Sequence, residues 1–299
     1  MDQRDWAGVF PAITTPFTSD LAVDHDALGE HARWLIGQGC VGIVALGSLG
    51  EAQTLLTEEK AGILATLRGA LPGVPLIAGI SGLSTPESVS MAQRAALAGC
   101  DGLMVLPAYV YKGDWRETKA HYSAVIAATS LSCMLYNNPI AYGTDVTPDQ
   151  LSELADRHAN LHAVKESSGD VRRVTHVRAR LGSRLNIFAG MDDMILESVP
   201  MGAVGWIAGL VNAFPAESVR VFELARDGRM DEARRLYEWF LPLLRLDTVP
   251  KFVQLIKLVQ EEMGHGTATV RPPRLTLDGE ERSEVLGLLR HALATRPPS

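Results

Sequence analysis

Cysteine is scarce in this chain, which has only Cys40, Cys100 and Cys133, far apart from one another. An odd and widely spaced set argues against a disulfide framework. Each cysteine lies where a small core residue would serve, which is the commoner role of a free cysteine. We therefore expect three unpaired thiols and a protein of the reducing cytoplasm.

Long apolar runs and runs of basic residues are also missing. No apolar stretch approaches the length needed to cross a bilayer, so we expect no membrane contact. Residues 1–20 lack a basic segment followed by an apolar core, so we expect no signal peptide. The net charge of −7 argues against a nucleic-acid surface. The eight histidines are scattered, without metal-ligand spacing, so we expect no metal site.

What the chain does have is a regular alternation of short β-rich runs and amphipathic helical runs. We expect strands at residues 9–14, 42–46, 76–80, 102–106, 133–136, 162–165, 186–189 and 203–207. The helices expected between them cover residues 24–37, 57–70, 85–98, 115–128, 147–157, 170–181 and 192–200. After the eighth strand the pattern becomes purely helical, at residues 215–225, 230–244, 249–263 and 281–294.

Eight strands that alternate with helices predict an α/β fold of the (β/α)₈ TIM-barrel type. A doubly wound open sheet is the alternative, although it usually has fewer strands and a glycine-rich dinucleotide turn after the first. Here Thr14, Thr15 and Pro16 follow the first strand instead. We expect a catalytic barrel over residues 1–212 and an appended C-terminal helical region over residues 213–299.

Lys165 is the most informative residue, because it closes a short apolar run and a turn follows directly. Active sites of such barrels lie at the carboxyl ends of the strands. An apolar wall disfavours the ammonium form and leaves an amine nucleophile, which suits Schiff-base chemistry. The plainer interpretation is a lysine whose stem packs while its charged head reaches water.

Other strand ends carry side chains that suit the same chemistry. Ser48, in the GSLGE turn of residues 47–51, offers a hydroxyl and backbone N–H groups for a carboxylate, although the glycines can simply permit the bend. Tyr136 can carry protons beside a lysine imine, or can be an aromatic residue at the barrel mouth. Asn137 and Asn138 can build the turn before Pro139. Asp192 most simply caps the helix after the seventh strand.

Three motifs in this order, GSLGE at 47–51, YNNP at 136–139 and KESSGD at 165–170, resemble the dihydrodipicolinate synthase / N-acetylneuraminate lyase family. The opening GVFPAITTPF is similar to the first strand of that family, and the resemblance covers essentially the whole chain. It implies a class I, Schiff-base-forming barrel that needs no cofactor, since the lysine imine is the electron sink. It also implies a homotetramer built as a dimer of dimers.

The resemblance also implies roles for individual residues. Lys165 would form the imine with a 2-oxo acid or a cyclic imine, and Tyr136 would shuttle protons beside it. Ser48 would relay protons to that tyrosine, and Tyr109 would complete the relay of a neighbouring subunit. The substrate carboxylate would be held by the backbone of Ser48 and Leu49. The other expected substrate-binding positions are Gly47, Asn138, Gly190 and Ile207.

Two departures from the family pattern bear on the substrate. Synthases of the lysine pathway carry an arginine two residues after the proline of the tyrosine motif, to bind the carboxylate of the aldehyde partner. Here that residue is Ala141, so this second anchor is missing. Leu49 replaces the second hydroxyl of the glycine-rich turn, which makes the pocket less suited to a sugar acid. Both changes favour a small substrate with one carboxylate.

Within the family, the sequences around Tyr136 and Lys165 look most like 1-pyrroline-4-hydroxy-2-carboxylate deaminases of hydroxyproline degradation. The expected products are 2,5-dioxopentanoate and ammonia. A 2-oxo acid aldolase, a 2-keto-3-deoxy sugar acid dehydratase and 4-hydroxy-tetrahydrodipicolinate synthase are the enzymatic alternatives, because they would share the lysine chemistry. A barrel that binds a carboxylate without catalysis is the alternative of a different class.

Overall fold

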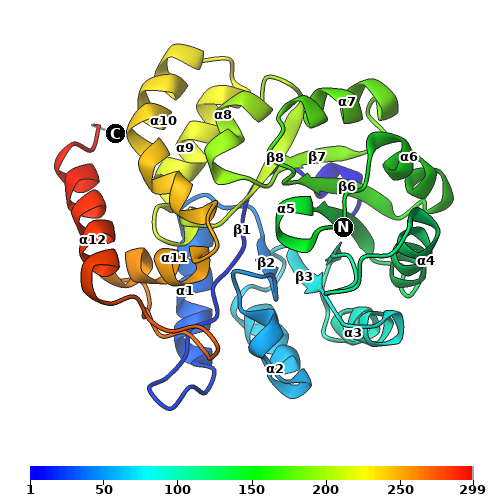
Figure 1. Ribbon diagram of the computed structural model, residues 1–299, viewed down its shortest axis with the longest axis horizontal. Coiled ribbons are helices and arrows are strands. Elements are labelled where there is room, and N and C mark those ends of the chain that lie inside the picture. Colours follow the sequence, from blue (N-terminus) through cyan, green and yellow to red (C-terminus); the bar gives the residue numbers. More distant parts are fainter. Residues whose placement is uncertain (298–299) are drawn as a thin grey trace.

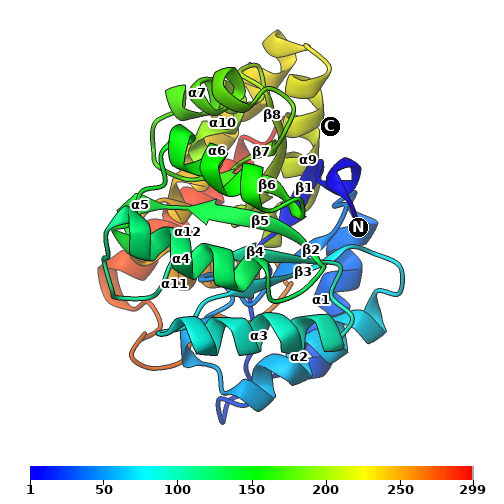
Figure 2. The same ribbon diagram turned by 90° about the vertical axis from the view of Figure 1, so that its right-hand side faces the viewer.

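Eight parallel strands form a single sheet at the centre of the computed structural model, which describes residues 1–297 (Figures 1 and 2). The strands are β1 (Gly8–Pro11), β2 (Ile43–Ala45), β3 (Leu76–Ile80), β4 (Gly102–Val105), β5 (Ser132–Asn137), β6 (Leu161–Glu166), β7 (Asn186–Ala189) and β8 (Ala203–Ala208). Their order is β1-β8-β7-β6-β5-β4-β3-β2.

The two edges of this sheet meet, which makes it a nearly closed barrel. The Ile13 N–H donates to the Val44 carbonyl at 3.0 Å, and the Val41 N–H donates to the Val9 carbonyl at 3.1 Å. These bonds join β1 to β2, as a doubly wound open sheet would not. The predicted TIM barrel is therefore confirmed.

The barrel strands are surrounded by helices α1 (His25–Gly37), α2 (Thr57–Ala70), α3 (Thr85–Leu97), α4 (Trp115–Ile126), α6 (Pro148–Arg157), α7 (Arg172–Leu181), α8 (Ile195–Ser198) and α9 (Pro215–Arg226). Several start at side-chain caps, as expected for orphan N–H groups. Asp24, Ser84, Asp114 and Thr147 each accept a backbone N–H of the first turn. Helix α9 packs against β1 and β8, so it completes the outer ring.

The structure differs from the expected elements in two places near the carboxyl ends of the strands. A helix was expected over residues 192–200, but the chain forms a 3₁₀ turn, η3 (Asp192–Met194), and then the four-residue α8. A short helix that was not expected, α5 (Pro139–Tyr142), follows β5. Its N-cap is Asn138, whose Oδ1 accepts the Ala141 N–H at 2.9 Å, and Gly143 ends it with φ of 69°.

Aromatic rings fill one part of the barrel interior. Phe10 of β1 lies 5.7 Å from Phe188 of β7 and 6.2 Å from Trp6, measured between ring centroids. Gly205 of β8 faces this cluster, and a Cβ there would lie within 2.6 Å of the Phe188 ring. Glycine at this position therefore lets the ring occupy the barrel interior.

The C-terminal helical region consists of α10 (Met230–Leu244), α11 (Phe252–Glu262) and α12 (Gly279–Ala294), which gather on one side of the barrel (Figure 1). Phe240, Leu243 and Leu244 are fully buried, so the apolar stripe of α10 is core, as its pattern indicates. None of the helices in residues 1–297 is long and apolar enough to span a membrane. The division of the chain at residue 212 stays a prediction.

Candidate active site

Lys165 is the last but one residue of β6, so it lies at the carboxyl end of the barrel, and it is 94 % buried. Its register partners are Tyr136 of β5 and Phe188 of β7. The Lys165 Nζ lies 4.3 Å from the centroid of the Tyr136 ring. The structure thus brings together the lysine and the tyrosine that the sequence singled out, and the plain snorkelling lysine does not fit this degree of burial.

The hydroxyl of Tyr136 is held by Asn138. The Asn138 Nδ2 donates to the Tyr136 hydroxyl at 3.1 Å, while the Asn138 Oδ1 caps α5. Asn138 was expected to bind substrate, and the structure instead gives both ends of its amide to the protein. It therefore helps to fix where the Tyr136 hydroxyl points, while the Tyr136 ring lies against Lys165.

The Ser48 hydroxyl contacts two tyrosines other than Tyr136. It hydrogen-bonds to the Tyr142 hydroxyl and lies 3.5 Å from the Tyr109 hydroxyl, to which Gln53 also donates. The Tyr142 ring lies 5.7 Å from the Tyr136 ring and 5.5 Å from the Tyr109 ring. Burial, and then the neighbouring Tyr136 and Tyr109, raise the pKa of Tyr142 well above its ordinary value.

Ser48 was expected to relay protons to Tyr136, and in the structure its hydroxyl bonds to Tyr142, whose ring packs against the Tyr136 ring, so the relay stays a prediction. Tyr142 is carried by α5, the helix that the sequence did not predict. The signal for it was nonetheless present, since Asn138-Pro139 is an N-cap pattern and Gly143 follows four residues later. Tyr109 is drawn into the same cluster from the loop after β4.

The GSLGE turn is anchored by its last residue, to which sequence reasoning gave no role. The Glu51 carboxylate is fully buried and accepts a hydrogen bond from the Lys257 ammonium of α11 at 3.0 Å. It also accepts the Arg271 N–H at 3.0 Å. The Leu49 side chain is buried beneath the turn, and Gly47 precedes Ser48. A buried ion pair thus fixes the backbone that was expected to hold a carboxylate.

Gly190, at the end of β7, is required by the packing of Lys165 itself. A Cβ at Gly190 would lie 2.8 Å from Lys165 Cε and would collide with the Ser167 hydroxyl. Ile207 is buried on β8 opposite Phe10. Gly190 was expected as a substrate-binding position, and its observed effect is to leave room for the lysine stem.

Asn137 and Glu166, the residues next to Tyr136 and Lys165, tie their strand ends together. Asn137 Nδ2 donates to Glu166 Oε2 at 3.1 Å, and its Oδ1 accepts the Val146 N–H at 2.9 Å. The Ser168 N–H donates to Glu166 Oε1 at 2.6 Å. Burial raises the pKa of Glu166, and these hydrogen bonds oppose the shift. Asn137 therefore does more than build a turn.

Asp192 does not cap the helix after β7, contrary to the expectation. Its fully buried carboxylate accepts the Trp206 Nε1–H at 2.9 Å, the Gly209 N–H at 3.1 Å and the Leu210 N–H at 2.8 Å. Burial raises the pKa of Asp192, while these donors and the charge of Lys165 lower it. The carboxylate thus pins the end of β8 beside the lysine.

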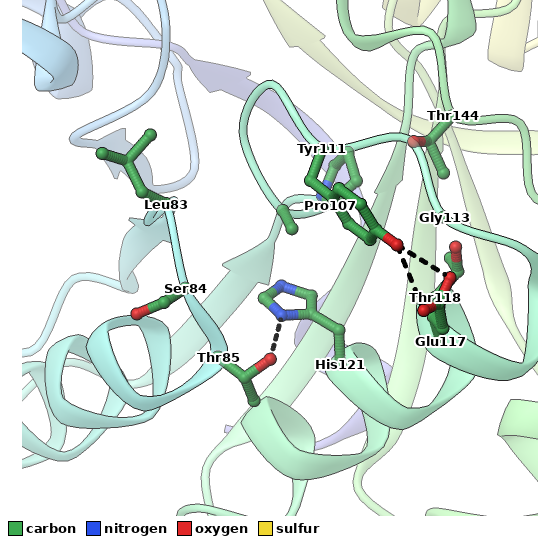
Figure 3. Close-up of a pocket in the computed structure, with 11 residues that line it drawn as sticks. Leu83, Ser84, Thr85, Pro107, Tyr111, Gly113, Glu117, Thr118, His121 and Thr144 are labelled. Atoms are coloured by element: carbon green, nitrogen blue, oxygen red, sulfur yellow. Dashed lines mark hydrogen bonds between the residues drawn. The ribbon is translucent and has the colours of Figure 1, made fainter.

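A separate cavity of about 250 Å³ lies between α3, α4 and the loop after β4 (Figure 3). It is lined by Ser84 and Thr85 at the start of α3, by His121 of α4 and by Tyr111. Lys165, Tyr136 and Ser48 do not line it. The His121 Nδ1 pairs with the Thr85 hydroxyl at 3.0 Å, which Figure 3 shows as a dashed line.

The three cysteines are unpaired and buried, as predicted. Burial raises the pKa of each thiol to about 12. A thiol so far from ionisation is a poor nucleophile, so the candidate chemistry rests on Lys165 and not on cysteine.

Taken together, a TIM barrel with polar side chains gathered at the carboxyl ends of its strands defines the class of barrel enzymes. Residues 5–292 match the model of the dihydrodipicolinate synthetase family. The chain is 31% identical over 296 residues to the 4-hydroxy-tetrahydrodipicolinate synthase of Haloarcula marismortui, which covers 99% of this chain and 95% of that one. The chain therefore belongs to the dihydrodipicolinate synthetase family, whose members are lyases.

Solved structures agree with this assignment. The 4-hydroxy-tetrahydrodipicolinate synthase of Methylacidiphilum fumariolicum SolV superposes with a TM-score of 0.91 at 28% identity, covering 96% of this chain and 97% of that one. YagE, a prophage protein of the same family from E. coli K12 solved in complex with pyruvate, has a TM-score of 0.90 at 26% identity, with 96% and 99% covered.

Proposed function

We propose that this protein is a lysine-imine deaminase that converts 1-pyrroline-4-hydroxy-2-carboxylate to 2,5-dioxopentanoate and ammonia. The observation that carries the proposal is the pairing of the buried Lys165 amine with the Tyr136 ring at 4.3 Å, at the carboxyl end of the barrel. A nucleophile and a proton carrier side by side are what imine formation needs.

The choice of substrate rests on the charges around this pair. Ala141 stands where the lysine-pathway synthases carry an arginine, and it offers nothing to a second carboxylate. The charge of Lys165 lowers the pKa of the nearby Asp192 and Asp247 carboxyls, against the larger effect of their burial. A substrate with one carboxylate and a basic nitrogen suits such surroundings better than a substrate with two carboxylates.

The reaction would start when Lys165 attacks C2 of the cyclic imine and the ring nitrogen leaves, so that the ring opens. The resulting imine acidifies C3, and loss of a C3 proton and of the 4-hydroxyl leaves a conjugated system. Tautomerisation places an imine at the terminal nitrogen, and water releases ammonia from it. Hydrolysis at Lys165 frees the product, so one water is consumed overall.

Tyr136 would move the protons of the nitrogens bonded to C2 and the proton lost from C3, because its ring lies against Lys165 and its hydroxyl is oriented by Asn138. The Ser48, Tyr142 and Tyr109 hydroxyls would connect this region to the barrel mouth. The backbone of Ser48 and Leu49 would hold the carboxylate and so fix C2 against the amine.

Incubation of the purified protein with 1-pyrroline-4-hydroxy-2-carboxylate tests the proposal. We expect ammonia and 2,5-dioxopentanoate in equal amounts from the wild type and neither from Lys165→Ala. Borohydride added during turnover should attach the substrate carbon skeleton to Lys165, which mass spectrometry of a digest detects. An enzyme that releases no ammonia but forms an imine with pyruvate would refute the deaminase function.

The second candidate is 4-hydroxy-tetrahydrodipicolinate synthase, which the names of the relatives favour. This reaction condenses pyruvate with an aldehyde that carries its own carboxylate. Lys112 lies against Gly143 at the end of α5 and would have to replace the missing arginine. Consumption of pyruvate together with aspartate semialdehyde, without ammonia release, would establish this function instead.

We further propose a homotetramer, built as a dimer of dimers, that works in the reducing cytoplasm. The family membership supports the assembly, and the three buried free thiols agree with a reducing compartment. Light scattering coupled to size-exclusion chromatography would show the subunit number, and a monomer would overturn it. In a tetramer Tyr109, which lies in the loop after β4, is the residue to test for a role across subunits.

A further inference from the structure

Asp247 comes from the C-terminal helical region but reaches the end of the barrel. It closes the 3₁₀ turn η5 (Arg245–Asp247), which follows α10 and contacts η3. Its carboxyl group lies directly over Gly209, because a Cβ at Gly209 would be 2.5 Å from Asp247 Cγ and 2.9 Å from Oδ2. Gly209 is the residue whose N–H holds Asp192 beside Lys165.

The two aspartates that lie here differ in how their oxygens are used. Asp192 accepts hydrogen bonds from Trp206, Gly209 and Leu210, so both its oxygens are engaged. Within residues 1–297, the Asp247 side chain has no hydrogen bond or ion pair, and it is only half-buried. Asp247 is therefore the carboxyl of this pair that can still meet a ligand.

We propose that Asp247 is the general acid that protonates the hydroxyl leaving C4 of the substrate. This inference rests on the proposed function, since only an elimination needs such an acid. It assigns the substrate to the class of 2-oxo acids or their cyclic imines that carry a hydroxyl on C4.

The step balances without any added reagent. The electron pair of the C3 carbanion, stored in the lysine enamine, forms the C3–C4 double bond as the C4–O bond breaks. The Asp247 proton joins the departing hydroxyl, which leaves as water. The carboxylate that remains takes a proton back from solvent, or from the water that later hydrolyses the terminal imine.

The charges that face Asp247 suit this role. Burial, and then the neighbouring Asp192, raise its pKa well above the ordinary value, while Lys165 lowers it and Asp193 raises it further. Arg245, on the same turn, lies 3.9 Å from Asp193 instead. A carboxyl whose pKa is raised by a second carboxyl is better suited to donate a proton than an ordinary aspartate.

Asp247→Asn tests the assignment, with Asp231→Asn, an exposed aspartate in the first turn of α10, as the control. We expect the control to stay within about twofold of wild type and Asp247→Asn to lose about 100-fold or more in ammonia release, the range of general acid catalysis. Borohydride trapping of Lys165 with pyruvate, and exchange of pyruvate C3 hydrogens in deuterated water, should be unchanged in both. The fall of kcat at high pH should also disappear in Asp247→Asn.

Gly209→Ala displaces the same carboxyl without changing its charge. Gly209 has φ of −96°, which alanine adopts freely, and the three atoms nearest to the added methyl all belong to the Asp247 carboxyl. We expect Gly209→Ala to reduce elimination in the wild type and to have little further effect in Asp247→Ala. Wild-type elimination rates in Asp247→Asn would overturn the assignment and leave the deaminase function standing.

A wild type that releases no ammonia refutes the proposed deaminase function instead. Water elimination from a 2-keto-3-deoxy sugar acid then decides on Asp247. Elimination by the wild type that Asp247→Asn loses would support the assignment on that substrate. Elimination from neither substrate would overturn it.

Discussion

The ion pair between Glu51 and Lys257 should be a large single contribution to the stability of the active-site end. The Lys257 ammonium is 99 % buried, donates to Glu51 Oε1 at 3.0 Å and to the Thr15 carbonyl at 2.9 Å, and lies 4.5 Å from the centroid of the Phe17 ring. Lys257→Met keeps the length of the stem but removes the charge. Glu51 then remains buried without its main partner.

Removing one partner of a buried ion pair costs about 3–5 kcal/mol. Glu51 would retain the Arg271 N–H at 3.0 Å and the Arg274 guanidinium at 3.7 Å, so we expect a loss near the lower end, about 3 kcal/mol. Because Glu51 anchors the turn that contains Ser48, the folded variant should also bind carboxylate substrates more weakly.

Urea unfolding followed by tryptophan fluorescence measures this loss. Lys251→Met is the matched control, because Lys251 pairs with Glu281 at 2.6 Å on the surface, where such a pair is worth about 0–1 kcal/mol. The double variant Glu51→Gln with Lys257→Met should recover part of the stability, since no buried charge is left alone. Equal midpoints for Lys257→Met and Lys251→Met would refute the reasoning.

Three further predictions follow from the same structure. Burial lowers the pKa of His31 to about 4, below its unfolded value of 6.5. Between these two pH values the unfolded chain binds more protons than the folded one. The free energy of unfolding should therefore fall by about 3 kcal/mol as the pH drops through this window. His31→Gln should flatten this loss in urea midpoints taken at pH 7.5 and 4.5, and an unchanged slope would contradict it. Gly190→Ala should displace the Lys165 stem, because an added Cβ cannot fit 2.8 Å from Lys165 Cε. Imine formation with pyruvate, measured by borohydride trapping, should fall at least about tenfold. Trapping at the wild-type level would argue against this packing. Lys112→Met should leave kcat/KM for the pyrroline within about twofold, whereas a rise in KM for a carboxylate-bearing aldehyde would favour the synthase, since one anchoring ion pair is worth about 1.5–3 kcal/mol.

Much of the fold could be predicted because it is written in local patterns. Alternating apolar strands and amphipathic helices predicted all eight barrel strands to within a few residues, and β3 and β7 have the bounds expected. The weak points were short elements. The sequence around Asp192 predicts a helix cap, but its carboxylate instead accepts hydrogen bonds from Trp206 of β8 and from the Gly209 N–H.

The pairing of Lys165 with Tyr136 was also within reach of the sequence. Both residues end apolar runs, and adjacent parallel strands bring equivalent ends to one rim. The register of β5 and β6 then pairs Tyr136 with Lys165 directly.

The sequence by itself determined the barrel, the rim on which the candidate site lies and the lysine at its centre. These depend on side-chain periodicity and strand direction, which act over a few residues. Only the tertiary structure decided that Tyr142 stands between Ser48 and Tyr136, that Lys257 anchors the turn of Glu51, and that Asp247 reaches Gly209. The Lys257 and Asp247 contacts depend on how the C-terminal helices dock, and the Tyr142 contact depends on how two loops meet at the barrel rim. No local pattern in the sequence records either.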